Sequence, residues 1–219
     1  MKKILLALAA VTLMGLAACT RPGQFRVTCE GAADNITSYV VDYATGDTIT
    51  CAVAKPGRVK IRGMAEPNAL LAVMEHGDGS ARALFFNDGT PVSVNYYNYH
   101  LLKGSELNMK LSEYDVKVQH DYEEMIFAYL DLLEMSEAER LVKSEDFNER
   151  FEALHAYLLQ IVEDNRDNLI PVAFLPTMYE MMTEEELADI LDPQYPYANH
   201  PFALIVKEHF GEMAPESEE

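Results

Sequence analysis

The sequence predicts an α+β fold in which an antiparallel β-sandwich-like part is followed by an α-helical part. Two observations support this class. Between about residues 24 and 103, apolar and polar residues alternate in short runs that end at Gly, Asn or Asp. From Ser105 onward, apolar residues recur every three or four positions, which is the period of an α-helix. The change of period places the boundary between the parts at residues 103 and 104.

Seven short strands are expected in the first part, because each alternating run is bounded by turn residues. Lys55-Pro56-Gly57 is one such turn, in which Pro sets φ and Gly accepts a positive φ. Seven strands at this spacing indicate a β-sandwich or an open barrel over residues 24–103. The expected strands span residues 25–29, 38–42, 48–54, 58–62, 68–75, 81–86 and 91–97.

The second part, residues 104–211, is expected to be helical. A long helix follows Ser105 and carries one apolar stripe from Leu107 to Leu132. The segments Ser136–Glu139 and Thr183–Glu186 both have the capping-box pattern that starts a helix. The capping box at Ser136–Glu139 starts a shorter helix, and a separate apolar stripe follows that helix along the sequence. The remaining helical segments are expected over residues 147–161, 171–182, 184–191 and 201–210.

The first 19 residues have the pattern of a bacterial lipoprotein leader. Lys2 and Lys3 precede an apolar run over residues 4–16, which is shorter than the roughly 20 residues that span a bilayer. Leu16-Ala17-Ala18-Cys19 is similar to the lipobox, in which the cysteine becomes the first mature residue and carries fatty-acyl chains such as palmitate. The sequence therefore predicts a signal peptide over 1–18 and a lipidated tether over 19–23, with an ordinary secretory cleavage site as the alternative.

The chain is strongly acidic, with a formal net charge of −19. Residues 1–18 contain two lysines and no acidic residue, so their removal changes the charge to about −21. Such a surface repels nucleic acid, which is therefore not an expected partner, and the membrane contact is expected through the lipid alone. Residues 20–24 lack the acidic residues linked to surface display in some bacteria, which favours an outer-membrane location facing the periplasm. Residues 212–219 are expected to form a disordered acidic tail.

Cys29 and Cys51 are the remaining thiols. An oxidising compartment permits a disulfide between them. Both alternate in phase with apolar neighbours, so both side chains are expected to face inward. The sequence leaves two alternatives open, which are a disulfide and two buried, unpaired thiols.

The segment Asn95-Tyr96-Tyr97-Asn98-Tyr99-His100 is the most unusual candidate for a ligand surface. Tyr96, Tyr97 and Tyr99 together form either a stacking platform for a sugar or peptide, or part of the core that packs against the long helix.

His120 and Glu124 have the spacing of half a metal site on a helix. They lie opposite the apolar stripe, which favours an ordinary solvated face. His155 and Glu152 on the next helical segment are a second pair of candidates. The sequence contains no Gly-x-Ser-x-Gly nucleophile motif and no phosphate or calcium loop. We therefore assign no catalytic, metal-binding or cofactor-binding residue.

Several short motifs resemble those of Bacteroidota lipoproteins that begin with domain-of-unknown-function family 4369. They are the lipobox, the segments 24–27 and 56–63, Leu84-Phe85-Phe86-Asn87-Asp88-Gly89, and the junction Gly104-Ser105-Glu106-Leu107-Asn108, which is similar to the family's G-S-x-x-N entry into the helices. Residues 165–191 also resemble the helical linker of that family.

Members of the family usually continue into a thioredoxin-like domain with a Cys-x-x-Cys pair. This sequence contains no Cys-x-x-Cys, so the resemblance transfers no redox activity to any of its residues. It implies the architecture and the location in the cell envelope. The expected function is a non-catalytic, lipid-anchored binding or scaffolding module, accessory to thioredoxin-like proteins. The alternatives are a thiol–disulfide redox protein that uses Cys29 and Cys51, and a glycan- or peptide-binding module centred on the tyrosines.

Overall fold

The computed structural model describes residues 22–75 and 82–213. In this part of the chain, eight strands are followed by five α-helices and two short 3-10 helices. The strands are β1 (Gln24–Glu30), β2 (Thr37–Asp42), β3 (Thr48–Val53), β4 (Arg58–Met64), β5 (Leu70–Glu75), β6 (Arg82–Phe86), β7 (Val92–Asn95) and β8 (His100–Lys103). The helices are α2 (Glu106–Glu134), α3 (Glu137–Glu163), η1 (Ile170–Phe174), α4 (Leu175–Met181), α5 (Glu184–Ile190), η2 (Pro196–Asn199) and α6 (Pro201–Met213).

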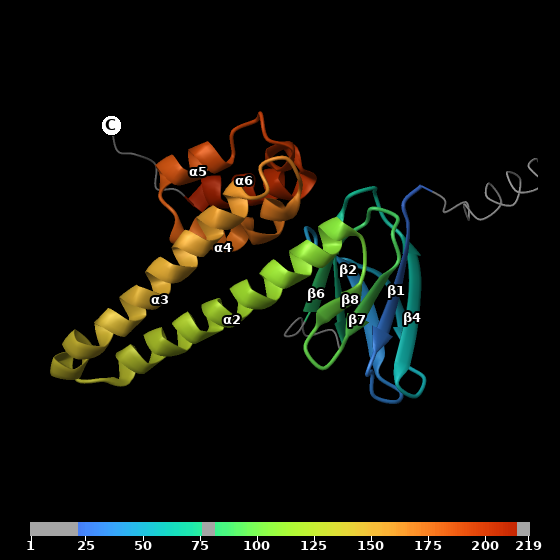
Figure 1. The fold of residues 1–219 in the computed structure, drawn as a ribbon, viewed down its shortest axis with the longest axis horizontal. Coiled ribbons are helices and arrows are strands. Elements are labelled where there is room, and N and C mark those ends of the chain that lie inside the picture. The colour runs from blue at the N-terminus through green and yellow to red at the C-terminus, as the bar shows by residue number, and fades with distance from the viewer. Residues whose placement is uncertain (1–21, 76–81, 214–219) are drawn as a thin grey trace, which may run out of the picture.

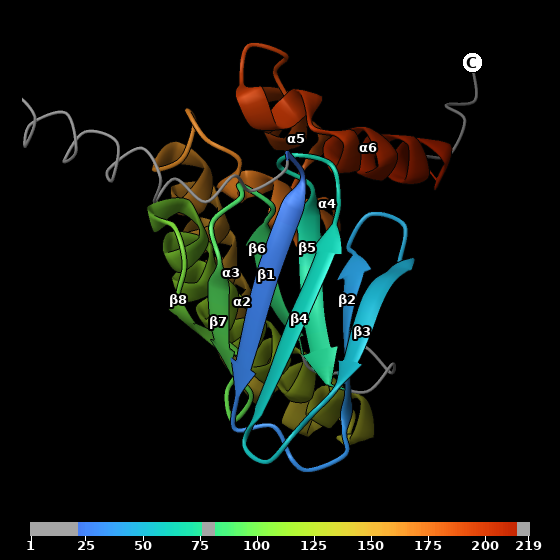
Figure 2. The ribbon, with the colours of Figure 1, turned by 90° about the vertical axis from the view of Figure 1, so that its right-hand side faces the viewer.

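The strands form two four-stranded sheets that pack face to face as a sandwich (Figure 2). Sheet A has the order β4-β1-β7-β8, and sheet B has the order β3-β2-β5-β6. Neighbouring strands run antiparallel, except that β1 and β7 are parallel. The predicted α+β fold with an N-terminal β-sandwich is therefore confirmed.

The sandwich core lies between the two sheets. Along β1 every second side chain is buried, as the alternating sequence predicts. A Cβ atom at Gly63 of β4 would lie only 2.4 Å from the Phe25 ring, so glycine allows this ring to pack flat on the neighbouring strand. The Phe25 ring meets Phe85 of β6 edge-on, with 6.1 Å between ring centroids.

Strand β5 of sheet B is buried on both faces. Leu71 and Val73 of β5 belong to the sandwich core, whereas Leu70 and Ala72 of the same strand belong to a second core formed with the helices. The molecule therefore has three layers, with sheet B between sheet A and the helical part. The sandwich and the helical part therefore share sheet B as a common middle layer.

Helices α2 and α3 form a long antiparallel hairpin (Figure 1). The N-terminal end of α2 packs against β6 and β8. The other end, with the start of α3, points away from both the sandwich and the C-terminal helices α4, α5 and α6 (Figure 1). Met125 is the last buried residue of α2, and Leu154 is the first buried residue of α3 among those whose side chains are described. Residues 126–153 contain no fully buried side chain among those described and reach the free end of the hairpin, and we call them the distal arm.

Helix α2 closes one edge of each sheet through two side chains that lie one turn apart. The amide of Asn108 accepts a hydrogen bond from Phe86 N of β6 at 2.6 Å and donates one to Phe86 O at 2.9 Å. The hydroxyl of Ser112 accepts a bond from Leu101 N of β8 at 2.9 Å. Edge strands β6 and β8 would otherwise present unpaired backbone groups, so these two contacts fix α2 to both sheets at once.

Three details differ from the sequence-based expectations. Strand β8 was not predicted, and the strand predicted over 91–97 ends at Asn95. The two helical segments expected after Ser136 form one continuous helix, α3, because nothing between them breaks the helical backbone. Helix α6 continues to Met213, two residues into the range predicted as a tail; the rest of that range lies outside the described residues.

Candidate functional site

The two thiols occupy different environments in different sheets. Cys29 of β1 is fully buried, and Cys51 of β3 is exposed. Both are free thiols in this structure. The inward orientation predicted for Cys51 is therefore wrong, because β3 is the edge strand of sheet B and presents that face of the strand to solvent. Cys19 lies outside the described residues.

Burial makes Cys29 a poor nucleophile. It raises the pKa of the Cys29 thiol to about 12, and the adjacent hydroxyl of Tyr96 only partly offsets this effect. A thiol needs a lowered pKa and access to solvent in order to exchange with disulfides, and Cys29 has neither.

We expect Cys51 to react with a thiol reagent within minutes in the native protein, and Cys29 only after unfolding. The measurement is the rate of modification of the purified protein with and without denaturant. Cys51→Ser should remove the fast reaction, and Cys29→Ser should leave it unchanged. Fast modification of Cys29, or a Cys51 that becomes reactive only after reduction, would contradict this expectation.

The three tyrosines do not form a common surface. They lie in the turn between β7 and β8, where Tyr96 is buried in the sandwich core and Tyr99 is half-buried. Tyr97 is 85% exposed, and its ring packs on Gly31. The rings of Tyr96 and Tyr99 stack on each other at 5.3 Å. Tyr96 and Tyr99 therefore anchor the turn to the sandwich core, and of the three tyrosines Tyr97 alone is exposed.

The histidines considered as metal ligands have other neighbours. Glu124 forms an ion pair with Arg150 of α3 at 3.0 Å, and His120 is exposed beside it on α2. His155 is paired with Glu186 of α5 at 3.2 Å. Among the described residues, no three His, Cys, Asp or Glu side chains lie close enough together to hold a metal ion.

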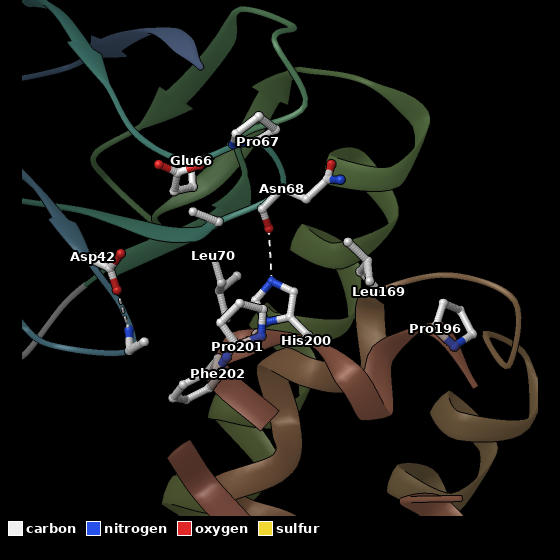
Figure 3. Close-up of a pocket in the computed structure, with 12 residues that line it drawn as sticks. Asp42, Glu66, Pro67, Asn68, Leu70, Leu169, Pro196, His200, Pro201 and Phe202 are labelled. Carbon is white, nitrogen blue, oxygen red and sulfur yellow. Dashed lines mark hydrogen bonds between the residues drawn. The ribbon is translucent and has the colours of Figure 1, made fainter. Parts of the chain in front are cut away.

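A hollow of about 310 Å³ lies where the ends of the strands meet the C-terminal helices (Figure 3). His200 at its base connects the two parts of the chain. Its Nε2–H donates to the carbonyl oxygen of Asn68 at 2.9 Å, and its Nδ1 accepts from Phe202 N at the start of α6, at 3.1 Å. Both ring nitrogens are therefore occupied by backbone groups, which assigns His200 a structural role.

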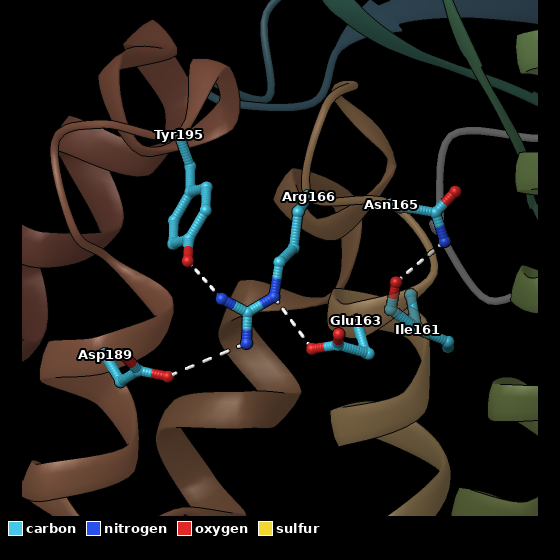
Figure 4. Close-up of polar contacts among 6 residues, drawn as sticks. All are labelled: Ile161, Glu163, Asn165, Arg166, Asp189 and Tyr195. Atoms are coloured by element: carbon cyan, nitrogen blue, oxygen red, sulfur yellow. Dashed lines mark hydrogen bonds and ion pairs between the residues drawn. The ribbon is translucent and has the colours of Figure 1, made fainter.

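A polar cluster joins the end of α3 to the C-terminal helices (Figure 4). The guanidinium of Arg166 donates to Glu163 at 2.8 Å and to the hydroxyl of Tyr195, and it lies 4.0 Å from Asp189 of α5. A hollow of about 380 Å³ opens beside it. Because the charge of Arg166 is already shared among three partners, the cluster holds these segments together.

The distal arm carries the most distinctive surface. Phe127, Leu130 and Leu133 of α2 are 62%, 48% and 54% exposed. They are spaced three residues apart and so lie along one side of the helix. We call them the distal surface. On the side that faces α3, Tyr129 packs against Phe147, with 5.8 Å between ring centroids.

Acidic residues outnumber basic residues on the distal arm. The distal arm contains eight Asp and Glu residues and three Lys and Arg residues. Arg150 is occupied by Asp146 of the same helix, at 3.2 Å, in addition to its bond to Glu124. The arm therefore combines an exposed apolar strip with a negative surrounding field.

The distal surface lies outside the apolar stripe of α2 that the helical period predicts, which runs through Met125, Tyr129 and Leu132. The signal was present in the sequence. The apolar face of this helix is wider than the single stripe that packing against one neighbouring helix requires. The additional apolar residues are Ile126, Phe127, Leu130 and Leu133.

Within residues 22–75 and 82–213, no helix combines the length and the apolar character needed to cross a membrane. No protein-family model matches this chain, and no curated protein matches it either.

Proposed function

We propose that the protein is a non-catalytic, lipid-anchored module of the cell envelope that binds another envelope protein through its distal arm. The observation that carries the proposal is the exposed apolar strip of Phe127, Leu130 and Leu133 on an arm that projects from the common core. Exposed apolar strips on soluble surfaces are typical of protein-binding sites. The anchor at Cys19 and the location at the outer membrane, facing the periplasm, are parts of the same proposal.

The net negative charge of the arm predicts the charge of the surface that a partner presents to it. A protein that covers this strip needs an apolar centre to bury Phe127 and Leu130, with Lys and Arg around it to match the net negative charge of the arm. Thioredoxin-like envelope proteins are the first class to examine, because the lipoproteins that this sequence resembles carry such a domain. The arm extends about 13 Å beyond Met125 at 1.5 Å per residue, which allows contact without obstruction by the sandwich.

The three-layer fold supports a scaffolding role for the rest of the chain. Asn108 and Ser112 fix α2 to both sheets, so the arm extends from a rigid base. A preorganised arm loses little conformational entropy on binding, which favours affinity.

The anchor can be tested separately from the arm. We expect the protein in intact cells to incorporate labelled palmitate and to sediment with the outer membrane. Cys19→Ser should abolish both, whereas Cys51→Ser should leave both unchanged. Palmitate incorporation into Cys19→Ser at the wild-type level would contradict the assignment of Cys19 as the lipid attachment site.

The binding role is tested by co-purification from solubilised envelopes. Wild-type protein should retain a defined partner that a variant with a polar distal surface loses. Retention of the same partner by both would contradict the proposed role of the arm.

A further inference from the structure

The outer face of sheet A is basic, although the chain as a whole is strongly acidic. The four strands of this sheet carry five Lys and Arg residues and one acidic residue, Glu30. Residues 104–213, in contrast, contain 25 acidic and seven basic residues. Most of the negative charge therefore lies in the helical part, and sheet A is the layer farthest from it (Figure 1).

The alternation of the strands places these cations on one surface. The residues that flank Arg26 in β1 and Lys60 in β4 are buried in the sandwich core, so the cations lie on the opposite side, which faces the viewer in Figure 2. The register sets Arg26 opposite Arg62, and Lys103 of β8 opposite Ser93 of β7. We call Arg26, Lys60, Arg62 and Lys103 the basic face.

None of the four cations of the basic face has an acidic partner in the part of the chain that the structure describes. The fifth cation of the sheet, Arg58, pairs with Glu30 at 2.8 Å. Like charges on directly opposite residues, such as Arg26 and Arg62, destabilise a sheet. Their retention without a partner favours an anionic surface outside the molecule as the group that compensates them.

The proposed lipid anchor lies at the edge of the same face. Strand β1 begins at Gln24, five residues after Cys19, and Gln24 is opposite Met64 at the end of β4. Five residues span at most about 18 Å, so acyl chains on Cys19 would hold this end of the sheet near a bilayer. Met64 is 53% exposed and lies on the same side of β4 as Lys60 and Arg62. Apolar side chains beside cations are typical of surfaces that contact lipid headgroups.

We propose that the basic face rests on an anionic phospholipid surface, whose phosphate oxygens accept hydrogen bonds from Lys60, Arg62 and Lys103. The proposal extends the lipid anchor proposed above and rests on it for the orientation of the molecule. Attraction between cations and anionic headgroups adds a second membrane contact to the inserted acyl chains.

The acidic helical part does not oppose this contact strongly. Charges in water are screened over about 8 Å at physiological ionic strength, and stacked layers lie about 10 Å apart. The helices are separated from the basic face by both sheets, so they lie beyond the screening length. The distal arm lies at the end of the molecule opposite sheet A and would point away from the bilayer (Figure 1).

The test is lysine footprinting of the full-length lipidated protein on vesicles. An amine-acylating reagent is applied on vesicles of phosphatidylcholine alone and on vesicles of equal parts phosphatidylcholine and phosphatidylglycerol, and mass spectrometry gives the rate at each lysine. We expect Lys60 and Lys103 to react at least about threefold more slowly on the anionic vesicles. Lys143 of the distal arm should react equally on both. About 0.5 M sodium chloride should remove the difference.

The combined change Lys60→Gln and Arg62→Gln should remove at least about half of the protection of Lys103, because Lys103 alone holds the bilayer weakly. The matched control is Lys110→Gln with Lys117→Gln, which removes two cations of α2 that contact Asp164 and Asp121 instead. It should keep the protection of Lys103. Circular dichroism verifies that each variant is folded, and soluble polyglutamate serves as the probe for an acidic protein partner.

The anchor and the basic face can fail separately in this experiment. Recovery of the protein with neutral vesicles tests the anchor, whereas the difference between the two kinds of vesicle tests the basic face. Equal rates at Lys60 and Lys103 on both kinds of vesicle, or unchanged protection of Lys103 in the folded double variant, would overturn the proposal. Equal protection by polyglutamate would assign the face to an acidic protein and would also overturn it.

Discussion

Replacing Asn108 with leucine is expected to lower the free energy of unfolding by about 1–3 kcal/mol. Leucine has a similar size and keeps the helix, but it makes neither of the two bonds to Phe86. The N–H of Phe86 then remains buried without an acceptor, which costs about 1–3 kcal/mol, whereas the C=O of Phe86 keeps the bond that Asp88 N donates at 2.9 Å. Equilibrium unfolding in urea measures the change.

The matched control is Asn148→Leu, which makes the same replacement at an exposed position of α3. We expect it to change the stability by less than about 0.5 kcal/mol. Ser112→Ala, which removes the single bond to Leu101 N, should have an intermediate effect of about 1 kcal/mol. If Asn108→Leu is as stable as the wild type, then closure of the sheet edges by α2 does not contribute to stability as proposed.

The combined change of Phe127, Leu130 and Leu133 to serine is expected to reduce partner capture by at least about tenfold and to leave the fold intact. The three side chains are about half exposed or more, so their removal costs little core packing. A central apolar residue of a protein interface typically contributes 2 kcal/mol or more to binding, and these three form the centre of the proposed contact. The measurement is quantitative co-purification from solubilised envelopes, alongside thermal unfolding of each variant.

The control uses a second pair of exposed apolar residues. Leu204 and Ile205 of α6 are 53% and 41% exposed but lie outside the distal arm. Changing both to serine should leave partner capture unchanged. Asp131→Lys with Glu134→Lys tests the charge match, since a basic partner should dissociate faster from this variant at low salt. Loss of capture in the α6 variant, or its retention in the triple variant, would exclude the distal surface as the binding site.

The sequence predicts the fold well where one period dominates. The alternation in β1 and the capping box at Thr183–Glu186 identified these elements directly. Strand β8 contains only four residues, and its position depends on the turn at Tyr96–Tyr99 and on the bond from Ser112. Such tertiary contacts are not visible in a local pattern.

The layered arrangement has a local signal in the sequence of β5. Leu70-Leu71-Ala72-Val73-Met74 is continuously apolar, which is typical of a strand covered on both faces. This pattern places a further layer over sheet B, and the structure supplies it with the helices. Prediction of the inward face of Cys51 failed for the opposite reason, since alternation alone does not reveal that β3 lies at an edge.

The candidate sites depend on contacts between distant parts of the chain. His200 and Asn68 are 132 residues apart in the sequence, and they meet only because the C-terminal helices pack against the end of the sandwich. No spacing rule relates them. The distal surface, in contrast, is a local feature of one helix, and the width of the apolar face predicts it.

Site-specific photo-crosslinking in intact cells tests the central claim most directly. A photoreactive amino acid at position 127, on the distal arm, should give one discrete crosslinked envelope protein. The yield should fall when Leu130 and Leu133 are changed to serine in the same chain. A probe at position 204 on α6 should not give that product. The absence of a discrete product at position 127, or the same product from both positions, would contradict the proposal that the distal arm binds a specific partner.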